Sequence, residues 1–316
     1  MEQAQRRGHH LTLFTRGLTN PDLFPDVERI TGDRDVEGGL DALAGRDWDA
    51  AIDTSGRRPL KVGAAATALS QSVDRYVFVS SLSVYPDGIR PGADEGTPVQ
   101  QLLDPAMIDS TDMVHYGALK AMSEAAAELA MPGRVLVVRP GLIVGRYDPT
   151  DRYGYWPQRL AAGGRVLAPG RPERVVQVVD ARDLAAWTLD MFEQGATGVF
   201  NAVGPALPLT MAEALAATRS GVRSDAELAW IDDDFLLQHG VQPWTQLGLW
   251  IPEVDDPSSG FMSVDCGRAI AAGLHFRPLD ETARDALEWE RERPPGPRRW
   301  LSRERETELL AEWDRR

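Results

Sequence analysis

The chain has 316 residues, 43% of them hydrophobic and 26% charged, which is enough to bury a sizeable core in one large or two modest domains. The net charge of -14 disfavours nonspecific binding to nucleic acid phosphates or anionic membranes, and no apolar run suits a membrane span or a signal peptide. Because Cys266 is the single cysteine, no internal disulfide or cysteine metal site can form, and we expect a cytoplasmic protein.

Short apolar runs alternate with helix-like stretches along the first part of the chain. Strands are predicted at 11–15, 27–33, 48–55, 75–81, 134–141 and 198–204, and helices rich in Ala and Leu at 60–73 and 116–131. The strands are continuous apolar runs with polar ends, which is typical of parallel strands covered on both faces. The sequence therefore predicts an α/β fold with a doubly wound parallel sheet.

The pattern changes after residue 205. Residues 210–221 are predicted to be helical and 226–232 to form a strand, whereas 232–260 are rich in Trp, Pro and Gly. We therefore divide the chain into a sheet-bearing domain at 1–205 and a smaller mixed domain with a C-terminal helix at 206–316. Residues 146–175 could be an insertion that joins the second domain.

The segment HYGALK contains the strongest chemical signal. Tyr116 and Lys120 lie four residues apart in a predicted helix, so both side chains lie on one face, where an ammonium can stabilise a tyrosinate. Tyr116 is therefore a candidate acid/base, although such a pair also arises by chance on amphipathic helices. Upstream, VFVSSLSVYPD ends an apolar strand in hydroxyl residues, and ligands bind at strand ends in open parallel sheets.

Five motifs occur in a characteristic order: YVFVSSLSVY, YGALK, RPGLIVGRYD, VVQVVDARDLA and GVFNAVG. Together they resemble the extended short-chain dehydrogenase/reductases, the NAD-dependent epimerase/dehydratase family, over nearly the whole chain. The resemblance implies a Rossmann-like dinucleotide-binding domain followed by a substrate domain. It also implies Ser81, Tyr116 and Lys120 as catalytic residues, with Lys120 also holding the cofactor's ribose, and a backbone near Pro140 and Gly141 that passes the nicotinamide.

Two features depart from the family at the amino terminus. Its Gly-x-x-Gly-x-x-Gly turn, which holds the cofactor diphosphate, is absent from the sequence. The strand at 11–15 resembles the family's second strand, yet only a helix tail at 2–9 precedes it, so roughly 20 residues of a usual βαβ opening are missing. Without the central first strand, sheet edges on both sides should stay unpaired.

Two explanations remain open for this opening. Either the reading frame starts too late, at an internal Met, or the chain is a variant that fills the gap otherwise or has lost the cofactor. For the chain as given, we expect NADP(H) binding that is weak or absent.

The residues after the candidate serine bear on the reaction. Leu82 and Ser83 occupy the positions at which sugar dehydratases of the family have Asp and Glu, so elimination of water is poorly supported. The resemblance then implies an NAD(P)-dependent oxidoreductase or epimerase acting on a small polar carbonyl or hydroxyl substrate. The alternative is a cofactor-free descendant that works as a non-redox enzyme or a binding protein.

Cofactor preference depends on the ends of the early strands. Arg16 closes the strand at 11–15, where a basic residue favours a 2′-phosphate, so we expect NADP over NAD, unless Arg16 is only a surface residue. Asp33 could lie near the adenine edge or cap a helix that begins around Val36. Thr54 and Ser55 would lie beside the cofactor's ribose or phosphates, unless they cap the next helix.

The candidate substrate contacts are Ser83, Tyr153, Tyr155 and Trp156. The three aromatic residues follow the segment after which the family builds its pocket, although apolar packing between the domains is an equally good interpretation. No cluster has metal-site spacing, so we expect no metal. The expected partner is a small-molecule substrate, with neither nucleic acid nor membrane, and a homodimer is left open.

Overall fold

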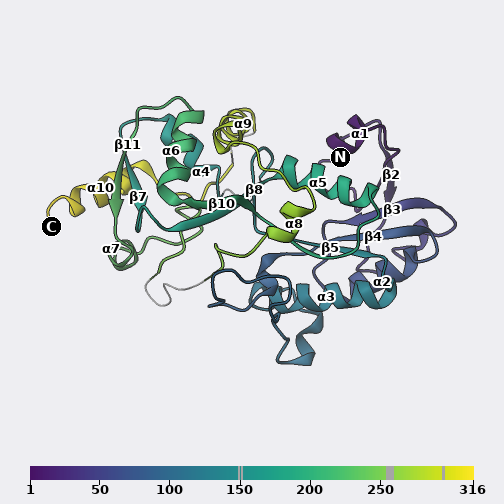
Figure 1. The fold of residues 1–316 in the computed structure, drawn as a ribbon. Helices are drawn as coiled ribbons and strands as arrows, with labels where there is room; N and C mark the ends of the chain where they lie inside the picture. The colour runs from purple at the N-terminus through teal and green to yellow at the C-terminus, as the bar shows by residue number, and fades with distance from the viewer. Residues whose placement is uncertain (149, 151, 254–259, 294–295) are drawn as a thin grey trace.

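A four-stranded parallel sheet forms the centre of one lobe of the computed structural model, which describes residues 1–148, 150, 152–253, 260–293 and 296–316 (Figure 1). Its strands follow the order β3-β4-β5-β9 and comprise Trp48–Asp53, Val73–Val79, Val135–Pro140 and Gly198–Ala202. All four are predicted strands, and the predicted α/β class is confirmed.

Helices cover both faces of this sheet. Alternate residues of β4 point to opposite sides, so Tyr76 and Phe78 pack with α2 (Pro59–Leu69) and α3 (Tyr116–Ala130), whereas Val77 packs with α5 (Ala181–Glu193). Figure 1 shows α2 and α3 on one side of the sheet and α5 on the other. The sheet is therefore doubly wound, as predicted.

A separate parallel pair lies beside this sheet, formed by β1 (Thr12–Thr15) and β2 (Glu28–Thr31). Among the described residues, backbone bonds join β1 to β2 and β3 to β4, but none joins β1 to β3. The side chain of Trp48 spans the interval, because its Nε1 donates to Thr12 Oγ1 at 3.2 Å. Ile52 of β3 is 43% exposed, whereas Val77 of β4 is 1% exposed. This arrangement agrees with the unpaired edges expected from the sequence.

The amino-terminal helix α1 is shorter than predicted and ends at Arg6 (Glu2–Arg6). The residues after it attach to α5. Arg7 Nη1 donates to Asp190 Oδ1 at 2.7 Å, and His9 Nε2 lies 2.8 Å from Glu193 Oε1. The side chain of His9 is thus partly exposed and faces a carboxylate on α5.

Residues 33–40 form turns rather than the helix predicted to begin around Val36, and the next helical element is the short 3-10 helix η1 (Asp41–Leu43). Gly38 has a φ of +72°, and a Cβ on Gly39 would lie 1.7 Å from the carbonyl oxygen of Asp33. The chain folds back on itself here, which a helix would not permit.

The rest of the chain builds a second lobe. One sheet has the order β10-β8-β6 and a second pairs β7 with β11. These strands are β6 (Leu142–Val144), β7 (Arg165–Pro169), β8 (Val175–Asp180), β10 (Gly204–Thr210) and β11 (Glu227–Ile231). The helices of this lobe are α4 (Tyr155–Ala161), α6 (Met211–Gly221), α7 (Asp233–Gln238), α9 (Leu279–Glu292) and α10 (Arg303–Trp313). The short helix α8 (Gly267–Ala271) instead packs on the central sheet, since Ala269 lies in one apolar cluster with Phe200 of β9 and Trp187 of α5.

One apolar core unites residues from 142–178 with residues from 211–310. Most of the suggested insertion at 146–175 therefore packs with the C-terminal part, while the domain boundary at 205/206 stays a prediction. Of the aromatic stretch at 232–260, residues 254–259 lie outside the described residues. None of the described helices combines the length and apolarity that a bilayer crossing needs.

A buried ion pair fastens α10 to this core. Arg159 Nε on α4 lies 2.9 and 2.7 Å from the two carboxylate oxygens of Glu306. The same carboxylate accepts from the backbone N–H of Leu167 at 2.9 Å. Both charged side chains are therefore removed from water and depend on each other.

Candidate functional site

The serine turn, residues 80–84, follows the carboxyl end of β4. Ser81 caps the 3-10 helix η2 (Leu82–Val84), since its Oγ accepts from the backbone N–H of Ser83 at 3.1 Å. The hydroxyls of Ser81 and Ser83 are also 3.1 Å apart. Both side chains are half-buried, so they remain within reach of a ligand.

The first turn of α3 packs directly against the serine turn. A Cβ on Gly117 would lie 2.0 Å from the carbonyl oxygen of Ser83, so only glycine permits this approach. The side chain of Gln100 also holds the turn, donating to the carbonyls of Ser83 at 3.0 Å and Tyr85 at 2.9 Å. The neighbour of Gly117 is Tyr116, so the helix start that carries this predicted acid/base meets the turn that carries Ser81.

Lys120 lies one helical turn further along α3 and is 3% exposed. Its Nζ donates to the carbonyls of Gly56 and Val79, both at 2.6 Å, and lies 4.3 Å from the ring centroid of Phe78. Burial lowers the pKa of Lys120 to about 8, although the nearby carboxylates of Asp53 and Glu124 oppose this effect. The lysine thus joins α3 to the carboxyl ends of β3 and β4.

The turn after β3 is organised by the buried carboxylate of Asp53. It accepts from Arg34 at 2.7 and 3.1 Å and from the Tyr76 hydroxyl at 2.8 Å. The backbone N–H groups of Ser55 and Gly56 donate to the same carboxylate at 3.1 and 3.0 Å. Burial alone would raise the pKa of Asp53, but the bonds from Arg34, Tyr76 and the backbone lower it overall.

The predicted cofactor contacts lie along this same edge of the structure. Thr54 and Ser55 are exposed, and neither caps α2, whose N-cap is Arg58. Arg16 is exposed just after β1, and among the described residues its side chain has no recorded hydrogen bond or ion pair. Asp33 Oδ1 accepts from the N–H of Asp35 at 2.9 Å, so it caps a turn.

Pro140 ends β5, and Gly141 leads into β6. A Cβ on Gly141 would lie 2.4 Å from Val203 Cγ2, so the backbone of Gly141 lies close against the residue that follows β9. The cofactor roles of Pro140, Gly141, Arg16, Asp33, Thr54 and Ser55 stay predictions.

A dinucleotide fits one half of this edge better than the other. Tyr116, Lys120 and Ser81 offer a proton donor, an ammonium and a hydroxyl of the kind that a nicotinamide riboside and its substrate need. The diphosphate half differs, because the sequence lacks the glycine-rich turn and β1 and β3 are not joined. The residues present therefore fit the nicotinamide end and lack the usual diphosphate cradle.

The predicted aromatic substrate contacts are buried in the core of the second lobe. Tyr153, Tyr155 and Trp156 are 1%, 2% and 0% exposed. The Tyr153 hydroxyl lies 2.9 Å from Thr218 Oγ1, and Trp156 Nε1 donates to the carbonyl of Gly248 at 2.6 Å. Their observed contacts are those of packing residues, and substrate contact by them, as by Ser83, stays a prediction.

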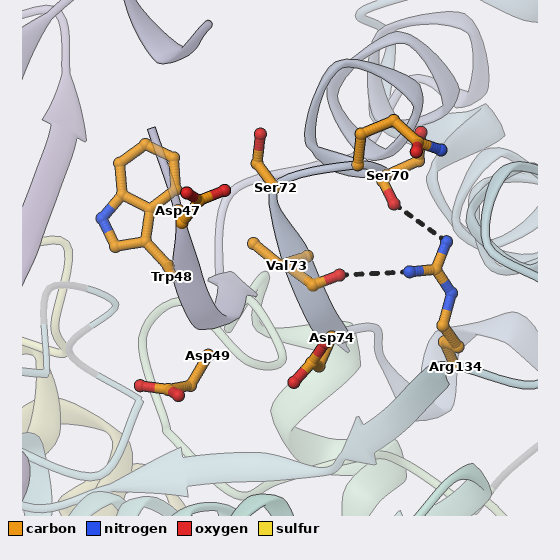
Figure 2. A pocket seen from close by; sticks show the side chains of 9 residues that line it. Asp47, Trp48, Asp49, Ser70, Ser72, Val73, Asp74 and Arg134 are labelled. Carbon is orange, nitrogen blue, oxygen red and sulfur yellow. Dashed lines mark hydrogen bonds between the residues drawn. The ribbon is translucent and has the colours of Figure 1, made fainter. Parts of the chain in front are cut away.

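A pocket of about 540 Å³ lies at the opposite edge of the sheet. Figure 2 shows its side chains around the amino ends of β3 and β4, with the Arg134 guanidinium donating to the carbonyls of Ser70 and Val73. Ligands of open parallel sheets bind at the carboxyl ends, so this pocket is not the candidate site. The described residues also contain no group of three or more His, Cys, Asp or Glu that could hold a metal.

Sequence reasoning missed a buried polar network behind the serine turn. Glu124 on α3 pairs with Arg139 on β5, with Nη2 2.6 Å from Oε2, and Arg139 Nη1 donates to the Tyr85 hydroxyl at 2.9 Å. The sequence feature that could have revealed Glu124 is its spacing. Tyr116, Lys120 and Glu124 lie four residues apart and therefore share one helical face.

Comparison with known proteins supports the fold. No protein-family model matches the sequence, and no curated protein sequence does. Among solved structures, the Bordetella bronchiseptica enzyme WbmH in complex with NAD+ has a TM-score of 0.66 at 17% identity, covering 92% of this chain and 93% of that chain. The UDP-Glc/GlcNAc 4-epimerase of Campylobacter jejuni has a TM-score of 0.65 at 16% identity, with coverage of 92% and 96%.

A third structure, the UDP-glucose 4-epimerase of Thermotoga maritima with UDP-glucose, has a TM-score of 0.64 at 15% identity and covers 92% of this chain and 94% of that chain. The likeness extends over both lobes. The chain therefore has the fold of the extended short-chain dehydrogenase/reductases.

Proposed function

We propose that the chain is an NAD(P)-dependent oxidoreductase or epimerase of the extended short-chain dehydrogenase/reductase type, acting on a small polar hydroxyl or carbonyl compound. The observation that carries the proposal is the packing of α3 against the serine turn, with 2.0 Å between a Cβ built on Gly117 and the Ser83 carbonyl oxygen. This packing brings the helix of Tyr116 and Lys120 to the hydroxyl-bearing end of β4, the edge at which ligands of parallel sheets bind.

The roles follow from the chemistry of the groups. Tyr116 would give a proton to the substrate oxygen or take one from it, while the Ser81 hydroxyl would hydrogen-bond that oxygen. The Lys120 ammonium, fixed by the carbonyls of Gly56 and Val79, would favour the tyrosinate form. A bound nicotinamide would supply or accept the hydride.

The residues after Ser81 favour these reactions over water elimination. Leu82 is apolar and 1% exposed, and Ser83 offers only a hydroxyl, because its backbone N–H already donates to Ser81 Oγ. Elimination of water requires a base that takes a proton from one substrate carbon and an acid that protonates the hydroxyl leaving the adjacent carbon. The serine turn provides no carboxylate for either role. Nucleotide sugars are the first compounds to test, because UDP-glucose is bound in the Thermotoga maritima structure.

A specific observation favours a second candidate, a cofactor-free descendant of the same fold. The sequence lacks the glycine-rich turn, and no described backbone bond joins β1 to β3 where that turn would lie. Such a protein would bind or convert its ligand at the serine turn without hydride transfer.

The two candidates are separated by one set of measurements on the full chain. Tryptophan fluorescence is titrated with NADPH and NADH, and UDP-glucose, UDP-galactose and UDP-N-acetylglucosamine are then incubated with NAD+ or NADP+ at saturating concentration. We expect dissociation constants weaker than micromolar, and reduced cofactor or an epimer that forms only when cofactor is added. Conversion without cofactor would favour the second candidate. Ser81→Ala should slow either reaction and therefore serves as the control that the site lies at the serine turn.

A further inference from the structure

Glu124 lies on α3 one turn beyond Lys120 and two turns beyond Tyr116, and it is 8% exposed. Its two carboxylate oxygens have three donors. Arg139 donates through Nε to Oε1 at 2.9 Å and through Nη2 to Oε2 at 2.6 Å, and Ser80 Oγ donates to Oε1 at 2.5 Å. The carboxylate is therefore a buried acceptor with both oxygens paired by charge-assisted or short bonds.

These partners belong to the elements that carry the candidate site. Ser80 directly precedes Ser81, and Arg139 directly precedes the Pro140-Gly141 turn at the end of β5. Glu124 itself belongs to the helix of Tyr116. One carboxylate thus connects β4, β5 and α3 at the edge where the candidate groups meet.

The network continues away from Glu124 without leaving Arg139 unpaired. The Tyr85 hydroxyl accepts from Arg139 Nη1 and lies 2.9 Å from both Asn201 Oδ1 and the carbonyl of Asp94. The guanidinium also lies 5.2 Å from the Tyr85 ring centroid. Because the network is satisfied, it can fix the spacing of the three elements rather than loosen it.

Glu124 also acts on Lys120 through charge. The charged groups around Lys120 are Asp53 at the end of β3, Arg34 after β2, and Glu124 on its own helix. Burial lowers the pKa of Lys120, the two carboxylates raise it, and Arg34 lowers it. Removing the carboxylate of Glu124 would therefore favour the neutral amine.

We propose that Glu124 is a positioning residue that, through Ser80 and Arg139, holds the serine turn, the end of β5 and α3 in register and places a negative charge one helical turn from the Lys120 ammonium. The benefit of this arrangement for catalysis rests on the proposed function, but the effect of Glu124 on the three elements and on Lys120 does not.

The test uses the lysine content of the chain, because Lys61 and Lys120 are its only lysines. Protein labelled with ¹³C at lysine Cε gives two signals, which Lys61→Arg assigns, and a titration between pH 6 and 11 yields the pKa of Lys120 directly. Glu124→Gln should lower this pKa below its value of about 8, because one nearby negative charge is lost.

The direction in which the pKa of Lys120 changes distinguishes the loss of a nearby charge from a loosening of the core. If Glu124→Gln only loosened the core, water would enter and the pKa of Lys120 would rise toward its ordinary value of 10.5. Glu306→Gln is the matched control, since it breaks the buried Arg159 pair in the second lobe and should leave the pKa of Lys120 unchanged. A pKa that is unchanged or raised in Glu124→Gln overturns the proposal.

If Glu124→Gln does not fold, the double variant Glu124→Gln/Arg139→Gln is measured in its place and tests the proposal. It removes both charges, and its two amides can still hydrogen-bond. The pKa of Lys120 should again fall, because of the two lost charges it is that of Glu124 that acts on Lys120, and an unchanged value overturns the proposal. The titration needs neither substrate nor cofactor, so a chain without turnover but with the expected fall would contradict only the proposed function.

Discussion

Gly117 and Ser83 approach so closely that a Cβ on Gly117 would lie 2.0 Å from the Ser83 carbonyl oxygen. Gly117→Ala should therefore push the first turn of α3, with Tyr116, away from the serine turn. We expect at least a tenfold loss of turnover and a stability loss of about 1–3 kcal/mol, typical of overpacking, measured by steady-state kinetics and urea unfolding.

Gly63→Ala provides the matched control for this variant. Gly63 is also inside a helix, α2, but a Cβ there would lie 3.5 Å from Ala126 Cβ, an ordinary contact. Alanine is the better helix former, so Gly63→Ala should be neutral or stabilising. Equal effects from both substitutions would show that the contact with Ser83 has no special importance.

Lys120 predicts a pH dependence of stability whose sign can be stated. Its folded pKa is about 8, below its ordinary value of 10.5, so between these pH values the unfolded chain holds more protons and the free energy of unfolding rises with pH. The rise should amount to roughly 3 kcal/mol over this interval. Lys120→Met should lack it, and parallel curves for the two proteins in urea unfolding would contradict the assignment.

The Arg159–Glu306 pair predicts how firmly α10 holds the second lobe. Glu306→Gln keeps an acceptor for the Leu167 N–H but leaves the Arg159 charge buried and unpaired. The expected cost is about 3 kcal/mol, because breaking a buried pair from one side is strongly destabilising. Urea unfolding measures this loss of stability. A midpoint equal to that of the unmodified chain would contradict the prediction and mean that water or another side chain stabilises the Arg159 charge.

Arg16 predicts the cofactor preference. If its guanidinium binds a 2′-phosphate, Arg16→Ala should weaken NADP binding by roughly ten- to a hundredfold, because charge-assisted hydrogen bonds contribute about 1.5–3 kcal/mol. NAD binding should change little. The pair of dissociation constants is measured before and after the substitution, and equal losses, or tighter binding of NAD by the parent chain, would leave Arg16 without this role.

The central sheet could be predicted because each strand is an apolar run bounded by polar residues. Local patterns were less informative where the fold depends on distant contacts. The turns at 33–40 arise because Gly38 and Gly39 let the chain fold back onto Asp33, which a count of helix formers does not reveal. The strand β7 was missed because its partner, β11, follows about sixty residues later.

The candidate site could be predicted in part for the same reason. Tyr116 and Lys120 share one helix, so their spacing identified them. The sequence analysis did not single out Glu124 or Arg139, because only the packing of α3 on β5 makes them a buried pair. The importance of Gly117 also depends on a contact across the fold, with Ser83.

The central claim is that Tyr116 moves a proton at the edge of the sheet, beside Ser81 and Lys120. The most direct measurement compares Tyr116→Phe with the unmodified chain in the most active pairing of cofactor and nucleotide sugar. The account predicts that the rate falls by about a hundred- to ten-thousandfold, the usual contribution of general acid–base catalysis, while cofactor affinity and the unfolding midpoint stay unchanged. A variant that keeps its rate within a few-fold of the unmodified chain would contradict the account.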